Sequence, residues 1–222
     1  MGAATHLGIN LHEYDAVIRT LIPHYADLID EAATAVAHIA RRRPAVVDLG
    51  TGSGALAAKV LAARPDARVI GIDEDAGMLA MAGKRLRGRI TTVHGNFERA
   101  VLPRCDVVTA SFALHHIRTD HRKASMYKRA FAALRRGGLL VSADCCLASS
   151  DRVQAAHRSA WIAHLRQAYS RKKAEGFLRA WAKEDVYFTL ARETELLEAA
   201  GFEVEVAWRR DSFAVIVAIR KT

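Results

Sequence analysis

Apolar residues recur at spacings of three and four along the first forty residues of the chain. This periodicity predicts helices over residues 11–22 and 24–40, with Pro23 between them. A proline in that place can open the second helix or kink one longer helix. From Pro44 onward the pattern changes to short apolar runs separated by connecting segments, several of them long enough to form a helix. That change indicates that the chain after Pro44 contains β-strands as well as helices.

Seven of the apolar runs are typical of β-strands. They cover residues 45–50, 67–73, 90–95, 105–111, 138–144, 203–208 and 213–220, and Gly137-Gly138 is expected to turn the chain before the fifth. Strands that alternate with helices predict a parallel sheet covered on both faces. The last two runs are separated only by RRDS, which predicts an antiparallel hairpin at the sheet edge. A helical stretch from about 147 to 181 predicts a cap.

The composition indicates one globular domain. A chain of 222 residues with 51% apolar and 26% charged residues can bury a core without disulfides or metals. We divide it into an N-terminal helical lid (1–43), a cofactor-binding core (44–146), a helical cap (147–190), and a helix with the terminal hairpin (191–222). The three cysteines include an adjacent pair, which argues against a disulfide scaffold and fits a reducing compartment.

Partners are constrained mainly by charge and by hydropathy. We find no apolar run of membrane-spanning length and no signal-peptide pattern, so we expect a cytoplasmic protein without membrane contact. The excess of 33 basic over 24 acidic residues gives a net charge of +9, which would permit a nucleic acid or an anionic metabolite. Because the basic residues are scattered and lack interleaved aromatics, we favour a solvated surface and do not expect nucleic acid.

The sharpest motif is VVDLGTGSG at residues 46–54, a buried strand that leads into three alternate glycines and a helix. Glycines at Gly50, Gly52 and Gly54 allow a tight turn and let a ligand approach the main chain. Asp73 ends the second strand, where a carboxylate can accept hydrogen bonds from both hydroxyls of a ribose. These features predict a nucleoside-containing cofactor across the carboxyl ends of the first two strands.

Three further residues argue against a dinucleotide. Asp48 precedes the first glycine by two positions, where its charge would repel a pyrophosphate but would suit a ligand with an ammonium or a sulfonium group. Asn96 and Phe97 follow the third strand, where an amide and a ring can read and cover an adenine. We therefore expect a cationic adenosine derivative.

With these motifs the chain resembles the class I S-adenosylmethionine-dependent methyltransferases over nearly its whole length. DLGTGSG matches the first motif of that family, IDED the second, HGNF the third, SFALHHI the fourth and LRRGGLLV the fifth. The family normally has Asp at the position of Asn96. The resemblance implies an α/β, Rossmann-like fold with a seven-stranded, mostly parallel sheet, S-adenosylmethionine as cofactor and S-adenosylhomocysteine as product.

The two ends of the chain look like the branch that contains carboxy-S-adenosylmethionine synthase and many small methyltransferases. In that branch a tyrosine of an IPxY turn contacts the cofactor, which implies this role for Tyr25. Ser111 stands where the branch has an asparagine. In the synthase an arginine supplied by the cap, from the same chain or across a dimer interface, contacts the extra carboxylate, and Arg179 is the nearest candidate. The branch also implies a homodimer.

Two sets of site residues follow. We expect the cofactor site to consist of Tyr25, Asp48, Gly50, Thr51, Gly52, Gly54, Asp73, Glu74, Met78, Asn96, Phe97 and Ser111. We expect the acceptor pocket to include Tyr14, Arg19, Phe112, Trp161 and Arg179. Met78 and Phe97 fit a hydrophobic core equally well, and aromatic residues on helices are more often core than pocket.

His115 and His116 follow the fourth strand, where donor and acceptor meet in this architecture. Either could accept a proton from the acceptor, although Leu-His-His is common in the family without a catalytic role. Cys145 and Cys146, beside Asp144 at the end of the fifth strand, are expected to be buried structural thiols. We find no group of residues with metal-ligand spacing and predict no metal.

The predicted function is in-line transfer of a methyl group from S-adenosylmethionine to a small-molecule acceptor. The sequence lacks a DPPY-like or NPPY-like motif after the fourth strand, which argues against methylation of DNA base amino groups. Two alternatives stay open: a carboxy-S-adenosylmethionine synthase that remodels the cofactor, and a cofactor-binding module without catalysis.

Overall fold

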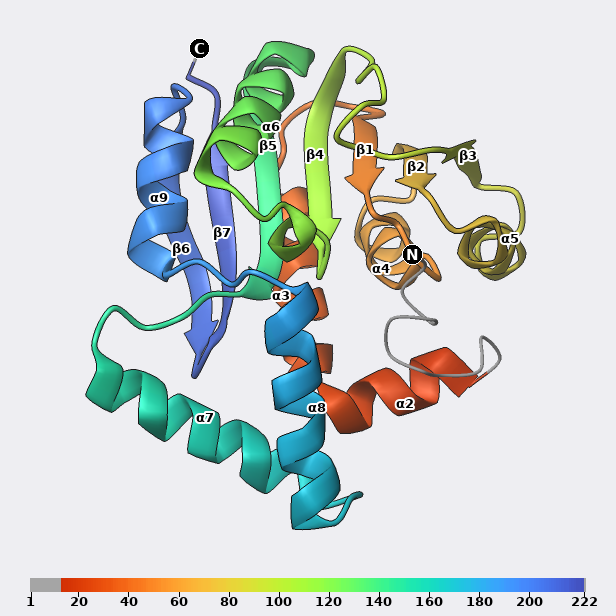
Figure 1. Ribbon diagram of the computed structural model, residues 1–222. Coiled ribbons are helices and arrows are strands. Elements are labelled where there is room, and N and C mark those ends of the chain that lie inside the picture. The colour runs from red at the N-terminus through yellow and green to blue at the C-terminus, as the bar shows by residue number, and fades with distance from the viewer. Residues whose placement is uncertain (1–12, 222) are drawn as a thin grey trace.

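The computed structural model describes residues 13–221, and a sheet of seven strands runs through it (Figure 1). The strands are β1 (Ala45–Leu49), β2 (Arg68–Asp73), β3 (Ile90–His94), β4 (Cys105–Ser111), β5 (Leu134–Cys145), β6 (Glu203–Arg210) and β7 (Phe213–Ile219). Their order is β3-β2-β1-β4-β5-β7-β6, parallel from β3 to β5, with β7 antiparallel to both of its neighbours. The predicted mostly parallel α/β sheet with a terminal hairpin at its edge is therefore confirmed.

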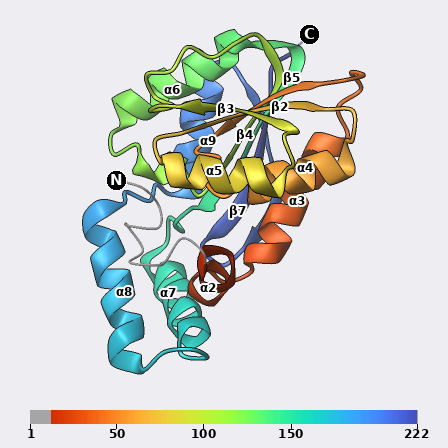
Figure 2. The ribbon, with the colours of Figure 1, turned by 90° about the vertical axis from the view of Figure 1, so that its right-hand side faces the viewer.

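Helices cover both faces of the sheet (Figure 2). One face carries α3 (Tyr25–Ala37), α4 (Ala55–Ala63) and α5 (Ala76–Arg85). The other carries α6 (Asp120–Ala133) and α9 (Leu190–Ala199). The remaining helices, α2 (Tyr14–Leu21), α7 (Asp151–Leu165) and α8 (Arg171–Glu184), lie beyond the carboxyl ends of β1 and β4 (Figure 1). The predicted cap thus consists of α7 and α8, and these two helices lie next to α2, the first described helix of the lid.

Alternation along the strands explains this layering. Val46 and Val107 belong to the hydrophobic cluster on the α3 side, whereas their chain neighbours Val47 and Val108 belong to the cluster on the α6 side. Successive side chains of a strand point to opposite faces, so a strand that is apolar throughout buries both faces. All residues of β4 except Ser111 are buried.

Helix boundaries follow local capping chemistry. Thr119, Ser170 and Thr189 precede α6, α8 and α9, and each side chain accepts a hydrogen bond from the backbone N–H three residues later. Pro23 lies in the turn between α2 and α3, so the chain forms two separate helices there. The first two residues of the helix expected over 11–22 lie outside the described residues. Within residues 13–221, the helices are too short or too polar to cross a membrane.

The start of β5 differs from the prediction. Gly137 and Gly138 lie inside the strand, which begins at Leu134, and the register to β4 shifts between Cys105 and Val107. A Cβ at Gly138 would come within 2.8 Å of the carbonyl oxygens of Arg135 and Asp106. The glycines therefore permit a bulge that lets the chain continue in the same strand.

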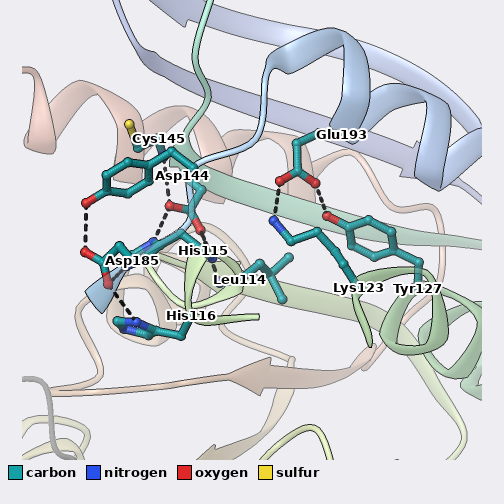
Figure 3. Close-up of polar contacts among 10 residues, drawn as sticks. Leu114, His115, His116, Lys123, Tyr127, Asp144, Cys145, Asp185 and Glu193 are labelled. Atoms are coloured by element: carbon teal, nitrogen blue, oxygen red, sulfur yellow. Dashed lines mark hydrogen bonds and ion pairs between the residues drawn. The ribbon is translucent and has the colours of Figure 1, made fainter. Parts of the chain in front are cut away.

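A buried ion pair joins the two helices on the α6 side of the sheet. Lys123 of α6 donates a hydrogen bond to Glu193 of α9, and Tyr127 donates to the other carboxylate oxygen (Figure 3). The side chains of Lys123 and Glu193 are 1% and 7% exposed, and the Lys123 ammonium lies 4.2 Å from the centre of the Phe188 ring. Each charge depends on the other, because neither can reach bulk water.

Removing one member of this pair should destabilise the fold strongly. Lys123→Met leaves the Glu193 carboxylate buried without its cation, and we expect it to lower the free energy of unfolding by about 3–5 kcal/mol. The double variant Lys123→Met/Glu193→Leu should recover most of that loss. Urea unfolding measures both, with the exposed pair partner Arg171→Ala as control, expected within about 0.5 kcal/mol of wild type. Equal losses in the single and double variants would contradict this account.

Candidate active site

A cavity of about 520 Å³ lies at the carboxyl ends of the parallel strands. Its wall is made of residues from the loops after β1, β2, β3 and β4, from the lid, and from the end of α8. Those that the sequence had singled out are Tyr14, Tyr25, Gly50, Thr51, Gly52, Asp73, Glu74, Asn96, Phe97, Ser111, Phe112 and His116. The structure thus brings together side chains that are far apart in the sequence.

The glycine loop after β1 forms the floor of this cavity. Gly50 and Gly52 have φ angles of +62° and +52°, in the left-handed region that glycine tolerates. A Cβ at Gly50 would lie 2.6 Å from the Cβ of Ala113. A larger residue would therefore clash with the loop after β4, so the backbone itself faces the cavity.

Asp48 does not line the cavity; it is 1% exposed and lies beneath the glycine loop. Its carboxylate accepts hydrogen bonds from the hydroxyls of Thr51 at 2.6 Å and Thr109 at 2.7 Å. Burial raises the pKa of Asp48 to about 6, against the effect of these two hydrogen bonds. Through these two hydrogen bonds Asp48 holds the glycine loop against β4.

Acidic and amide groups form the wall above β2 and β3. The carboxylate of Asp73 accepts hydrogen bonds from the backbone N–H groups of Gly52 at 2.8 Å and Asp75 at 2.9 Å. Burial raises the pKa of Asp73 despite these two bonds. Asn96 donates its amide hydrogen to the carboxylate of Glu74. Each Asp73 oxygen still has acceptor capacity, because a carboxylate oxygen can accept more than one hydrogen bond.

The lid closes one side of the cavity. Asp15 of α2 accepts a hydrogen bond from the Ser53 hydroxyl of the glycine loop at 2.8 Å. Tyr25, the first residue of α3, stacks on Phe112 with ring centres 5.7 Å apart. Phe112 itself has φ of +48°, a strained conformation for a residue with a side chain.

A smaller cavity of about 50 Å³ adjoins the first. Aromatic rings dominate its wall, which consists of Tyr14, Ile18, Ile22, Phe112, His115, His116, Cys145, Trp161, Trp181, Asp185 and Tyr187. Burial raises the pKa of Tyr14 to about 12, so this phenol is neutral at physiological pH. The wall is therefore largely uncharged except at the histidines and Asp185.

A cluster of histidines and carboxylates lies in the wall of the smaller cavity, and its member His116 lines both cavities. Figure 3 shows the contacts within this cluster. His115 Nδ1 lies 2.7 Å from Asp144 Oδ1, and His115 Nε2 lies 3.7 Å from Asp185 Oδ1. His116 Nδ1 is 3.1 Å from the same oxygen of Asp185, whose other oxygen accepts the Tyr187 hydroxyl at 2.8 Å. We call His115, His116 and Asp185 the histidine cluster.

Burial and neighbouring charges shift the pKa values of His115 and its partner Asp144 in opposite directions. Burial alone lowers the pKa of His115, but the charge and hydrogen bond of Asp144, together with the charge of Asp185, raise it above its ordinary value. Burial raises the pKa of Asp144, whereas the charge and hydrogen bond of His115 hold it below the ordinary value. His115 is 9% exposed and His116 is 42% exposed at the side chain, so His116 is the member that solvent and ligands reach.

Several predicted site residues lie elsewhere. Met78 is a fully buried residue of α5, and Gly54 precedes α4, where a Cβ would come within 3.0 Å of Ala82. Arg19 lies 5.7 Å from the centre of the Tyr25 ring and lines neither cavity. Arg179 is exposed on α8, with a guanidinium nitrogen 3.7 Å from Glu175 of the same helix.

No pattern in the sequence connects Asp144 or Asp185 with the two histidines. The sequence places Asp144 at the end of the fifth strand, and it offers two roles for Glu184 and Asp185, contact with a cationic acceptor or a helix cap. The position of Asp144 could have been a signal, because parallel neighbours β4 and β5 end side by side. No local pattern ties Asp185 to His116, because their contact depends on the path of the chain after α8.

The fold and part of the sequence are similar to proteins of known families. The profile of a family described as "Methyltransferase domain" matches residues 46–138. The chain is 19% identical to a carboxy-S-adenosyl-L-methionine synthase of Nautilia profundicola over 93% of this chain and 90% of that protein.

Solved structures share the architecture. An O-methyltransferase family protein from Burkholderia thailandensis has a TM-score of 0.72 at 17% identity, covering 100% of this chain and 63% of that one. Human N-acetylserotonin methyltransferase in complex with S-adenosylmethionine has a TM-score of 0.63 at 17% identity, covering 95% of this chain and 66% of that one. At these identities the similarity establishes the fold.

The buried carboxyl of Asp48 should make stability fall as pH rises. Its pKa is about 6 in the folded protein against an ordinary 3.8. Between about pH 4 and about pH 6 the folded state therefore holds a proton that the unfolded chain has lost. This group should lower the free energy of unfolding by about 3 kcal/mol across that window.

Urea unfolding at about pH 4 and about pH 7, without added ligand, isolates this effect when wild type is compared with Asp48→Asn. Asparagine stays neutral and can still accept a hydrogen bond from a threonine hydroxyl, so the variant should lose less stability over the window. Glu205→Gln, on the exposed edge strand, serves as control and should follow wild type. A variant with the same pH dependence as wild type would contradict the assignment.

Proposed function

Because the chain belongs to the class I S-adenosylmethionine-dependent methyltransferases, we propose that it transfers a methyl group from this cofactor to a small-molecule acceptor. The observation that carries the proposal is the wall shared by the two cavities. Tyr14, Phe112 and His116 line both of them. A cofactor in the larger cavity and an acceptor in the smaller one would therefore meet beside the histidine cluster.

The residues of the larger cavity fit S-adenosylmethionine. Gly50 exposes its backbone where a Cβ has no room, which suits close approach of a ligand to the main chain. Asp73 and Glu74 supply carboxylate acceptors for the ribose hydroxyls, and Asn96 and Phe97 supply an amide and a ring for the adenine. A volume of about 520 Å³ is within the range of small-molecule sites.

Asp48 acts on the cofactor through Thr51. Its carboxylate holds the hydroxyl of Thr51, which lines the cavity, and so fixes the loop in one conformation. The negative charge that Asp48 carries above pH 6 also favours a cationic ligand nearby. We therefore assign Asp48 a positioning and electrostatic role, and Tyr25 a packing role against Phe112.

When bound, S-adenosylmethionine supplies a methyl group whose bond to sulfur breaks as the bond to the acceptor forms, leaving S-adenosylhomocysteine. The chain must orient the acceptor, exclude water and receive any proton that the acceptor loses. The aromatic wall around Phe112 and Trp161 suits a planar, largely apolar acceptor, and the cavity of about 50 Å³ must widen to admit one. We place removal of its proton at the pair His115 and His116, where His115 is oriented by Asp144.

A hydroxyl group is the acceptor that this arrangement favours. A hydroxyl must lose a proton on methylation, and the histidine cluster lies in the wall of the acceptor cavity. The homodimer and the cytoplasmic location stay predictions.

The synthase alternative requires an arginine that faces the methyl position. Arg179, the candidate from the cap, lies on an exposed face of α8 beside Glu175. Arg179 therefore does not reach the larger cavity within one chain, whereas Arg118 and Arg122 line it, so the synthase stays an alternative to methyl transfer. Mass spectrometry of the nucleoside released after turnover separates the two, since the synthase would yield a carboxylated cofactor instead of S-adenosylhomocysteine.

Loss of the Asp73 carboxylate should weaken cofactor binding. Asp73→Ala removes two charge-assisted acceptors and releases Gly52 and Asp75, so we expect the Kd for S-adenosylmethionine to rise at least tenfold, on the order of 1.4 kcal/mol or more. Isothermal titration calorimetry measures this, with Glu205→Ala as a control that should bind like wild type. An unchanged Kd in Asp73→Ala would contradict the proposal that the ribose hydroxyls bind to Asp73.

Loss of the His116 side chain should slow methyl transfer without affecting cofactor binding. We expect His116→Ala to lower kcat by about 10²–10⁴-fold, the range typical of a lost proton acceptor. The Kd for S-adenosylhomocysteine should stay within about twofold, because the cofactor contacts remain. His121→Ala, an exposed histidine on α6, is the matched control.

The assay measures formation of S-adenosylhomocysteine with a panel of small phenols, amines and carboxylates. Turnover with a phenol that depends on His116 supports the proposal. Cofactor binding without turnover on any acceptor would favour the non-catalytic module, and a wild-type rate in His116→Ala would exclude this histidine.

A further inference from the structure

Three potential metal-ligating atoms converge in the histidine cluster. One ring nitrogen each of His115 and His116 and one carboxylate oxygen of Asp185 all lie within 4.8 Å of one another. Two of the pairs that these atoms form are closer, at 3.7 Å for His115 to Asp185 and 3.1 Å for His116 to Asp185. Ligand atoms that share one metal ion at about 2.0–2.2 Å lie at such separations after small adjustments.

Neighbouring hydrogen bonds orient two of these three groups. Asp144 lies 2.7 Å from Nδ1 of His115, which leaves Nε2 directed to the cluster (Figure 3). The Tyr187 hydroxyl donates to Asp185 Oδ2 at 2.8 Å, which leaves Oδ1 directed to both histidines. A carboxylate on the far nitrogen of a ligating histidine is the usual outer partner of a metal site, since it fixes the tautomer and raises the basicity of the ligand.

The donor set selects a class of metal ion. Two imidazoles and one carboxylate suit divalent first-row transition metals such as Zn²⁺, Co²⁺ and Fe²⁺, whereas Mg²⁺ and Ca²⁺ prefer oxygen ligands throughout. Three protein ligands are also the number typical of catalytic zinc sites, which keep a further position for water or substrate. All three residues line the smaller cavity, so that position would face the acceptor.

We propose that His115, His116 and Asp185 bind a divalent transition-metal ion at the acceptor cavity. The inference deepens the proposed function and rests on it for its catalytic consequence: the ion would lower the pKa of an acceptor hydroxyl that contacts it, so that the hydroxyl loses its proton to solvent before the C–O bond forms. In the metal-bound protein the two histidines would act as ligands in place of proton acceptors. Metal binding itself needs neither cofactor nor acceptor, and it can be measured alone.

The competing explanation is a cluster held together by protons. An imidazolium at His115 between the carboxylates of Asp144 and Asp185 would account for the same distances without a metal. The two explanations predict different responses of the protein to added Zn²⁺. A protonated ion-pair cluster would resist the metal, whereas a metal site would release protons as it binds Zn²⁺.

The experiment is titration of the untagged, chelator-treated full chain with Zn²⁺ at neutral pH, by calorimetry against a competing chelator. We expect one equivalent to bind. In Asp185→Asn and in His116→Ala the Kd should rise at least about tenfold. Asp185→Asn keeps an acceptor for Tyr187, and His116 is 42% exposed, so at least one variant should fold. Circular dichroism checks the fold of each, and His121→Ala serves as the matched control and should bind Zn²⁺ like wild type.

Co²⁺ provides a spectroscopic signature. With nitrogen and oxygen ligands in a site of low coordination number, Co²⁺ should give visible absorption bands that the two variants lose and His121→Ala keeps. Less than stoichiometric Zn²⁺ binding by wild type, or equal affinity in wild type and His116→Ala, would overturn the inference.

The outcomes separate this inference from the proposed function. Zn²⁺ binding without S-adenosylmethionine binding would keep the metal site and overturn the methyltransferase. Methyl transfer at full rate by a chain that binds no Zn²⁺ would keep the methyltransferase and overturn the metal site.

Discussion

The carboxylate of Asp144 is the constraint on which the active-site region depends. It is buried at the end of β5, and it accepts hydrogen bonds from the backbone N–H groups of Leu114, His115 and Cys145 as well as contacting the His115 ring. A buried charge without partners would cost several kcal/mol, so the loop after β4 must stay where these donors reach it. That loop contains both histidines and Phe112, and it supplies the wall between the two cavities.

The same loop is coupled to the cap. The backbone N–H of Val186 donates to the carbonyl of His115 at 3.1 Å, and Leu147 forms a bridge to Thr189. Asp185 is placed by these contacts, because it directly precedes Val186. A single polar network therefore joins the ends of β4 and β5, the cap and the acceptor cavity, and such networks specify one arrangement when all their members are satisfied.

Local chemistry explains how much of this could be predicted from sequence. The strands and the glycine loop were predictable because apolar runs, alternate glycines and a strand-ending carboxylate act over a few residues. The bulge at Gly137 and the burial of Asp48 depend on β4, which lies alongside through long-range pairing. The contact of Asp185 with two histidines and the outward position of Arg179 depend on how the cap packs, which no spacing along the chain encodes. The larger cavity contains most of the predicted cofactor residues. The histidine cluster could not be predicted, because its residues come together only when the chain folds.

The position of β7 has a consequence for how the chain reaches this state during translation. Among the described strands β7 is synthesised last, yet it lies between β5 and β6 and is antiparallel to both. Until β7 has been synthesised and has left the ribosome, the edge of β5 has no partner along residues Leu139 to Cys145, and most of these residues are apolar. An unpaired apolar edge is a template for aggregation. The nascent chain is therefore most in need of a chaperone in the interval before β7 emerges.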